Sequence, residues 1–171
     1  MIGTMQKELI NLENSYLAAS NTDERFEVDK QYLHYLEELI KNNPKNVQYL
    51  IYLGVLSWEP FHKPEQGIAY LQKAIEEDPK NIEARFWLAK CYYHDFCAYD
   101  KAKELLLEAL QFDPTRADCL CILTSIIEDT TKNWKEAINY LERAIQYAPD
   151  WPMLYLCLAS LYLRVGDVKA A

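Results

Sequence analysis

The sequence predicts an all-α solenoid of stacked antiparallel helix pairs, and a repeat of 35 residues is the main reason. Four prolines recur at this spacing, and a column of leucines keeps the same spacing beside columns of small residues. Self-similarity at a fixed period of this size is typical of architectures in which each repeat buries its apolar face against its neighbours. The prolines are Pro44, Pro79, Pro114 and Pro149, and the leucines are Leu53, Leu88, Leu123 and Leu158.

Each period has the pattern of two helices that cross closely. In "NIEARFWLAKCYYH" and "YDKAKELLLEALQFDP" the apolar residues recur at helical spacing, and a proline ends the pair because it cannot continue a helix. Small residues at the expected crossings, such as Gly54 with Gly67 and Ala89 with Ala102, would let the two backbones approach. The glycines are interpreted as packing positions, since no G-x-G-x-x-G or Walker-type run is present.

Capping signals support the helix starts. Asn133 with Glu136, and Thr115 with Asp118, have the spacing of a capping box, in which side chains satisfy the free N–H groups of the first turn.

The repeat predicts the domain organisation. An N-terminal helical hairpin, with helices at about 5–19 and 23–42, is interpreted either as a degenerate repeat or as a cap. Gly166 and Asp167 are predicted to form a turn, followed by the start of another helix, which favours a chain cut from a longer repeat protein over a native open end. The predicted segments are 1–44 for the hairpin, 45–79, 80–114 and 115–149 for three repeats, and 150–171 for a partial fourth repeat.

The order of residue types resembles the tetratricopeptide repeat family. In residues 80–114 the family pattern of a leucine, a small residue and a tyrosine, and then a small residue, a leucine, an alanine and a proline, is matched by Leu88, Ala89, Tyr92, Ala102, Leu106, Ala109 and Pro114. The resemblance covers about residues 45–171. It implies a right-handed superhelix in which the first helix of each repeat lines a concave groove that binds a protein segment.

The sequence departs from the family pattern at three points. Its period is one residue longer than the family's usual 34, so each turn inside a pair should carry about one extra residue. Arg85 stands where the family has a bulky apolar residue, and Ser57 stands where it has a tyrosine.

Composition excludes several classes of function. The net charge is −8, with 26 acidic and 18 basic residues, which argues against nucleic acid as the main partner. No stretch resembles a signal peptide or a membrane span, and the five cysteines are an odd number, so free thiols in a reducing cytoplasm are expected.

The resemblance also indicates which residues would line the groove. Aromatic side chains gather at one end and acidic ones in the middle, so the expected partner is a protein or peptide, and the acidic residues favour a basic one. Tyr52 and Trp87 are equally compatible with the core between repeats, and Ile51 with its counterparts could not clamp a chaperone's C-terminal carboxylate. The groove candidates are Ile51, Tyr52, Val55, Trp58, Phe86, Trp87, Lys90, Tyr93, Cys121, Ser125, Glu128 and Asp129.

Catalytic chemistry has little support in the sequence. Cys91, His94 and Cys97 have a spacing that could hold zinc, but no fourth ligand is evident. No histidine comes with a motif for a nucleophile or a base, so neither an enzyme nor a cofactor or metal site is predicted.

A non-enzymatic interaction scaffold is therefore the leading hypothesis. The alternatives are a dedicated acidic partner protein of bacteria, such as a secretion chaperone or a toxin-immunity protein, and a regulatory module of a longer protein. Self-association is also expected, because an uncapped C-terminal end would expose Leu154, Leu158, Leu161 and Tyr162.

Overall fold

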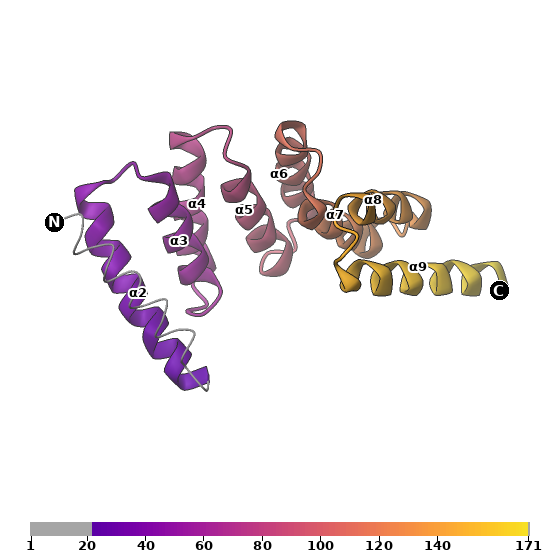
Figure 1. Cartoon of the computed structure of the whole chain (residues 1–171), viewed down its shortest axis with the longest axis horizontal. Helices are drawn as coiled ribbons and strands as arrows, with labels where there is room; N and C mark the ends of the chain where they lie inside the picture. Colours follow the sequence, from indigo (N-terminus) through magenta and orange to yellow (C-terminus); the bar gives the residue numbers. More distant parts are fainter. Residues whose placement is uncertain (1–21, 171) are drawn as a thin grey trace. The chain divides into compact units, whose positions relative to one another are not determined.

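The computed structural model describes the backbone of residues 22–170, and side chains as far as residue 166. These residues form helices and connecting turns without a strand, so the predicted all-α repeat architecture is confirmed (Figure 1). The expected helix at about 5–19 lies outside the described residues. The helices are α2 (Thr22–Asn42), α3 (Val47–Trp58), α4 (Pro64–Glu77), α5 (Ile82–His94), α6 (Tyr99–Phe112), α7 (Ala117–Thr130), α8 (Trp134–Tyr147) and α9 (Pro152–Ala170).

The first compact unit, described over residues 22–79, holds α2, α3 and α4. Leu36 and Leu39 of α2 are buried against Leu53 of α3. At the crossing of α3 and α4, a Cβ atom built on Gly67 would lie 2.8 Å from the carbonyl oxygen of Gly54. The glycines are therefore packing positions, as the sequence predicts, because a methyl group would collide with backbone.

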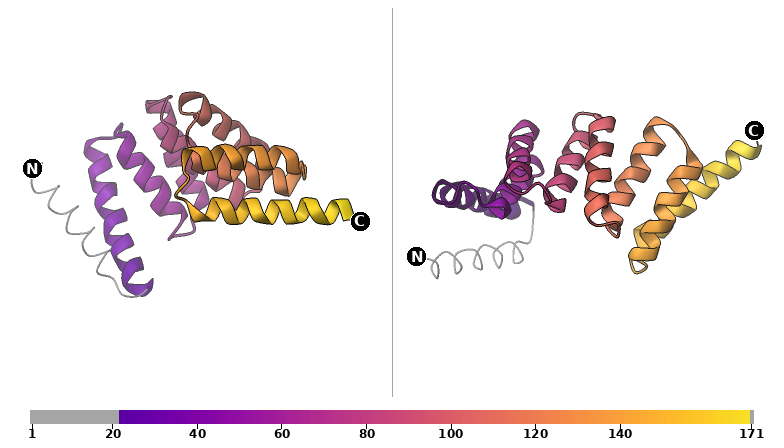
Figure 2. Two further views of the ribbon diagram at one scale, coloured as in Figure 1. Left: turned by 45° about the vertical axis from the view of Figure 1, so that its right-hand side comes forward. Right: turned by 90° about the horizontal axis from the view of Figure 1, so that it is seen from above.

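The second compact unit, residues 80–170, contains the antiparallel pairs α5/α6 and α7/α8, followed by α9 (Figure 2). One continuous core joins these helices, and the repeated leucine and alanine columns supply much of it. At the crossing of α7 and α8 the small position holds Thr124 instead of Gly or Ala. Its hydroxyl donates to the carbonyl of Leu120 at 3.0 Å and lies 3.5 Å from the carbonyl of Ala137, so the polar atom is satisfied where the helices meet.

Asparagine side chains begin three of the helices. The Oδ1 atoms of Asn46, Asn81 and Asn133 accept from backbone N–H groups three residues later, at 3.0, 2.9 and 3.4 Å. The expected capping box of Thr115 is wrong: α7 begins after Arg116, and the Thr115 hydroxyl donates to Asp113 at 2.6 Å. Asp113 competes for this hydroxyl from the preceding turn, and the start of α7 has no side-chain cap.

The turns inside the pairs share one backbone feature that keeps the 35-residue period. His62, Cys97 and Lys132, again 35 residues apart, have φ angles of 50°, 48° and 51°. This left-handed conformation closes a helix end, and in the first turn the N–H of Lys63 then reaches back to the carbonyl of Ser57 at 2.9 Å. The same backbone device thus recurs in all three pairs without a glycine.

The two departures from the family pattern have different consequences. Arg85 is buried, and its Nε donates to Glu108 at 2.9 Å while its guanidinium lies 5.3 Å from the centre of the Phe112 ring, so its charge and its carbon chain are both accommodated. Ser57 is fully buried, and its hydroxyl has no hydrogen-bond partner among the described residues. Such an orphaned hydroxyl costs about 1–3 kcal/mol.

The predicted turn at Gly166 and Asp167 is wrong. Helix α9 continues without a break from Pro152 to Ala170, and no glycine in the described chain has a positive φ. A Cβ atom built on Gly166 would meet nothing within 4 Å, so no packed neighbour draws the backbone out of the helix at this point. Without such a contact, continued helical hydrogen bonding satisfies the backbone.

Candidate protein-binding face

In the first unit, α3 carries four of the groove candidates, and they differ in exposure. Tyr52 is exposed, and its ring lies 6.2 Å from that of Tyr32 on α2. Val55 is half-buried. Ile51 is 2% exposed and Trp58 only 7%, so both belong to the core and offer a partner little surface.

In the second unit, α5, α7 and α9 bring the remaining candidates together on one side. We call this side the A face, and it consists of Trp87, Lys90, Tyr93, Cys121, Ser125, Glu128 and Asp129, with the neighbouring Glu83, Arg116 and Arg164. Phe86 is only 9% exposed and packs edge-on against Trp87, with ring centres 5.3 Å apart. Phe86 therefore packs behind Trp87 and contributes little exposed surface to the A face.

The indole of Trp87 is held from two directions. Its Nε1 donates to Glu83 at 2.7 Å, and the Nζ of Lys90 lies 4.4 Å from the centre of the ring. A lysine at this distance over an aromatic face is favourable by about 0.5–1 kcal/mol where it is exposed. Trp87 is half-buried, so part of its apolar surface stays accessible in a defined orientation.

A hydrogen bond joins α5 to α7 within the A face. The hydroxyl of Tyr93 donates to Asp129 at 2.8 Å, and the Tyr93 ring lies 5.9 Å from that of Tyr99. Burial, followed by the bond to the Asp129 carboxylate, raises the pKa of Tyr93 well above its usual range. The phenol therefore stays protonated as a donor and fixes the position of the aromatic ring.

Two of the three acidic residues of the A face, Glu83 and Glu128, are paired with arginines. Glu128 lies 3.2 Å from Arg164 on α9, and Glu83 lies 3.2 Å from Arg116, which also contacts Asp118. Burial raises the pKa of Glu128, while Arg164 opposes that shift. The acidic character that the sequence suggests is thus partly neutralised, and Asp129 remains an exposed carboxylate.

The periodicity offered a signal for Arg164 that the sequence interpretation did not use. Arg164 lies one period after Asp129, on the same side of the next first helix, so it could have been included among the candidates. Arg116 was harder to identify, because it lies at a helix start where an N-cap residue is expected.

The described chain has no activated thiol at Cys121, and it does not assemble a metal site around Cys91, His94 and Cys97, whose spacing in the sequence lacks a fourth zinc ligand. Burial, and then the nearby Cys157, raise the pKa of the Cys121 thiol to about 11, so it is protonated and a poor nucleophile at neutral pH. Cys91 is buried whereas Cys97 is exposed in a turn. Among the described side chains no three His, Cys, Asp or Glu residues are placed to hold a metal ion.

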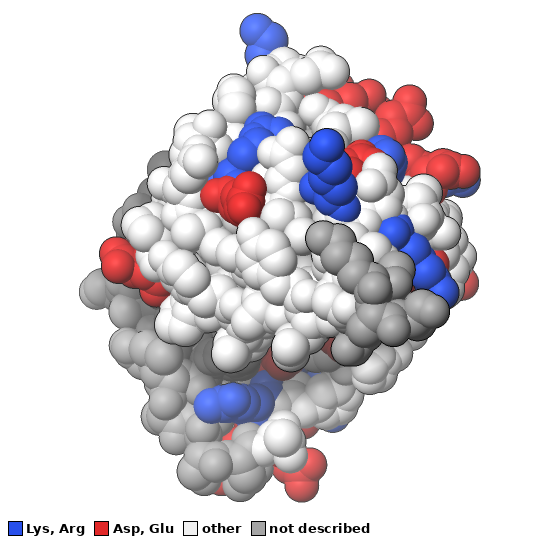
Figure 3. All heavy atoms as spheres, turned by 90° about the vertical axis from the view of Figure 1, so that its right-hand side faces the viewer, with Lys and Arg blue, Asp and Glu red and all other residues white. Residues whose placement is uncertain are grey.

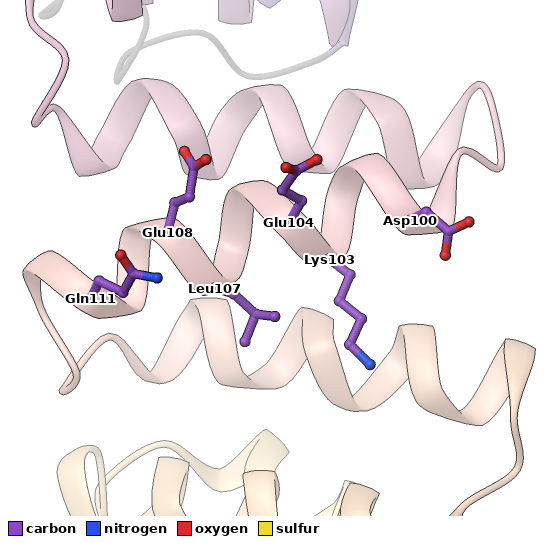
Figure 4. A pocket seen from close by; sticks show the side chains of 6 residues that line it. All are labelled: Asp100, Lys103, Glu104, Leu107, Glu108 and Gln111. Atoms are coloured by element: carbon purple, nitrogen blue, oxygen red, sulfur yellow. The ribbon is translucent and has the colours of Figure 1, made fainter.

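A shallow hollow of about 450 Å³ lies on α6, away from the A face. Figure 4 shows its lining side chains projecting from this one helix, with Glu104 and Glu108 on one side and Lys103 and Leu107 on the other. Glu108 is paired with Arg85 and Lys103 lies 3.9 Å from Glu136, so two of its charges are already engaged. With one apolar side chain in its lining, the hollow offers a ligand little to bind.

No helix in the described part of the chain is both long and apolar enough to cross a membrane.

The chain matches a known family. A tetratricopeptide repeat model matches residues 62–120, about a third of the chain, from the turn before α4 into α7. The family match over these residues and the helix-pair architecture support a tetratricopeptide repeat protein. A comparison of the sequence with curated proteins gives no match.

Solved structures of low sequence identity share the fold. A crystal structure of MamA is 21% identical, with 83% of this chain and 80% of that chain covered and a TM-score of 0.69. MamA from residue 41 to its end, from Desulfovibrio magneticus RS-1, is 16% identical over 97% and 88% of the chains, with a TM-score of 0.73. YrrB, described as a TPR protein with an unusual peptide-binding site, is 21% identical over 93% and 85%, with a TM-score of 0.67.

Proposed function

We propose that this chain is a protein-interaction scaffold whose A face binds a peptide or a protein segment. The tetratricopeptide repeat architecture supports a protein partner, since stacked helix pairs present extended surfaces suited to such binding. The peptide-binding site ascribed to YrrB, which has the same fold, is consistent with this function.

The observation that carries the proposal is the fixed pair of aromatic side chains on α5. Trp87 and Tyr93 each have their polar atom hydrogen-bonded within the chain, at 2.7 and 2.8 Å, while their rings stay partly accessible. Aromatic anchors that are already ordered lose little side-chain entropy when a partner binds, and Trp and Tyr are common hot spots of interfaces.

The charges around these rings favour a partner segment that carries both apolar and charged side chains. Lys90, Arg116 and Arg164 supply positive charge, and the exposed carboxylate of Asp129 supplies negative charge beside Tyr93. A segment with an apolar or aromatic side chain for Trp87 and a basic residue near Asp129 would match this arrangement.

The test is the capture of a partner from the native host by the tagged chain, followed by a comparison of variants. Trp87→Ala is expected to weaken binding of the captured protein about tenfold or more, because it removes the central anchor. Tyr147→Ala is the matched control: Tyr147 is an exposed aromatic at the end of α8 and should be replaceable without loss.

Circular dichroism of each variant shows whether the fold is retained. Trp58→Ala is unsuitable as a test because Trp58 lies in the core, so its truncation would unfold the first unit. Full binding by a folded Trp87→Ala variant would place the site outside the A face.

A further inference from the structure

The A face offers a partner two contact points at a separation that its helices fix. The first is the half-buried indole of Trp87 on α5, and the second is the exposed carboxylate of Asp129 on α7, which accepts a hydrogen bond of 2.8 Å from Tyr93 of α5. Trp87 and Tyr93 lie six residues apart in one helix, which separates them by about 9 Å along its axis. With the sideways step toward α7, the indole and the carboxylate are roughly 10–13 Å apart.

Lys90 makes the surface around Trp87 unfavourable for a positively charged side chain. Its Nζ lies 4.4 Å from the centre of the indole and 6.0 Å from the centre of the Phe86 ring, so one cation already lies over the aromatic surface. A lysine or arginine of the partner at this point would be placed beside the ammonium group, and like charges at short distance repel. An apolar side chain meets no such repulsion, so the partner residue that fits Trp87 is apolar.

Asp129 has the opposite preference. Its neighbour Glu128 is paired with Arg164 at 3.2 Å, whereas the donor to Asp129 is the neutral phenol of Tyr93, which leaves the negative charge of this carboxylate in place. At the α9 end of the chain, which faces the viewer in Figure 3, blue and red side chains lie scattered around a broad uncharged area. Single side chains, and not one continuous charged field, therefore select the charge of a partner here.

The distribution of apolar groups favours an extended segment over a helix as the occupant. A helix that binds in a groove uses a row of apolar anchors at intervals of three and four residues. On α5 and α7 the aromatic anchors are instead separated by polar side chains, which are those of Lys90, Ser125 and Asp129. An extended segment exposes backbone N–H and C=O groups that such side chains can bind. At about 3.3 Å per residue, it spans the two contact points with three or four residues.

We propose that the A face recognises an extended segment in which an apolar residue and a basic residue lie three or four positions apart, and that Lys90 fixes their order. The apolar side chain packs on Trp87, and the basic side chain pairs with Asp129. Lys90 determines specificity because it excludes a basic side chain from the indole. This inference rests on the proposed function, since it describes what the A face binds.

Selection of displayed random peptides against the full chain tests the spacing. The peptides have about twelve residues, which is enough to span both contact points when extended. Those enriched on wild type are expected to carry an apolar residue and a lysine or arginine three or four positions apart. On Asp129→Asn the basic position should lose its enrichment while the apolar position keeps it. A spacing of about seven, typical of one face of a helix, or no common spacing, would overturn the proposal.

Lys90→Met tests the order of the two residues. Without the ammonium group the indole is open to a cation, so peptides with a basic residue in place of the apolar one should be enriched as well. Lys103→Met on α6 removes the same charge away from the A face and is the matched control, which should select the same peptides as wild type. An unchanged preference on Lys90→Met, shown to be folded by circular dichroism, would overturn the role of Lys90.

Fluorescence anisotropy with the most enriched peptide separates this inference from the proposed function. Replacing the basic residue of the peptide by alanine should weaken binding to wild type about tenfold, but binding to Asp129→Asn at most about twofold, because that pair is already broken. Peptides that bind folded Trp87→Ala as tightly as wild type would contradict the A face as the binding site. Peptides that need Trp87 but share neither spacing nor order would contradict the inference alone, and so would a library that yields no binder.

Discussion

At the scale of single residues, the glycine crossing of α3 and α4 has the least room for change. A Cβ atom on Gly67 would lie 2.8 Å from the Gly54 carbonyl oxygen and 3.0 Å from the Cβ of Trp58. Since the nearest atom is backbone, the helices would have to separate. Gly67→Ala is expected to lower the free energy of unfolding by about 1–3 kcal/mol, measured by urea denaturation.

Gly166→Ala is the matched control for this substitution. Gly166 also lies in a helix, but an added methyl group would meet no atom within 4 Å. The higher helix propensity of alanine should make this variant as stable as wild type or slightly more so. Equal losses at both glycines would show that helix propensity, and not the close crossing, decides the cost.

The crossing could be predicted from the sequence, but the burial of Trp58 and Phe86 could not. Small residues at a fixed spacing have one simple packing interpretation. Trp58 and Phe86 lie at the margin of the apolar side of their helices, where periodicity is compatible with either core or groove. The space left by Gly67 allows Trp58 to pack inward, and the Arg116 guanidinium, 5.5 Å from the Phe86 ring centre, helps to cover Phe86.

At the scale of the elements, the turns inside the helix pairs depend on a left-handed residue that is not glycine. Lys132 has a φ of 51°, and its N–H donates to the carbonyl of Ile127 at 2.9 Å. For a residue with a Cβ atom this conformation costs about 1 kcal/mol, while for glycine it does not. Lys132→Gly should therefore raise the free energy of unfolding by about 0.5–1 kcal/mol in chemical denaturation.

Lys135→Gly, a few residues further on, is expected to change the free energy of unfolding in the opposite direction. Lys135 is exposed in the first turn of α8, where glycine has no conformational advantage, and the substitution should cost up to about 1 kcal/mol. If both glycine variants lose stability, the left-handed turn is not under strain and its side chain contributes to the fold instead.

The helices of the three full pairs could be predicted because prolines and apolar columns recur through them. The end of α9 could not be predicted in the same way. "Gly-Asp" favours a turn only when a second helix packs back, and the described structure places none against Gly166. Because no described residue packs against Gly166, the Gly-Asp pair does not form a turn, and helix α9 continues through it.

At the scale of the whole molecule, net charge and local charge suggest different partners. The chain carries a charge of −8, which attracts any basic protein at long range. On the A face, however, Glu83 and Glu128 are paired with arginines, and Asp129 is the exposed carboxylate beside the aromatic anchors. The two effects can be separated by a pair of substitutions that change the net charge equally.

Asp129→Asn and Glu76→Gln form that pair. Each removes one negative charge; the side-chain amide introduced by Asp129→Asn can still accept from Tyr93 through its carbonyl oxygen, and Glu76 is exposed on α4 in the other unit. If the partner places a basic residue at Asp129, only Asp129→Asn should weaken binding, by about three- to tenfold at low salt, and the loss should shrink as salt is added. Isothermal titration calorimetry at two salt concentrations measures this difference. Equal weakening by both substitutions would mean that overall charge attracts the partner, and no weakening by either would mean that the bound segment is not basic.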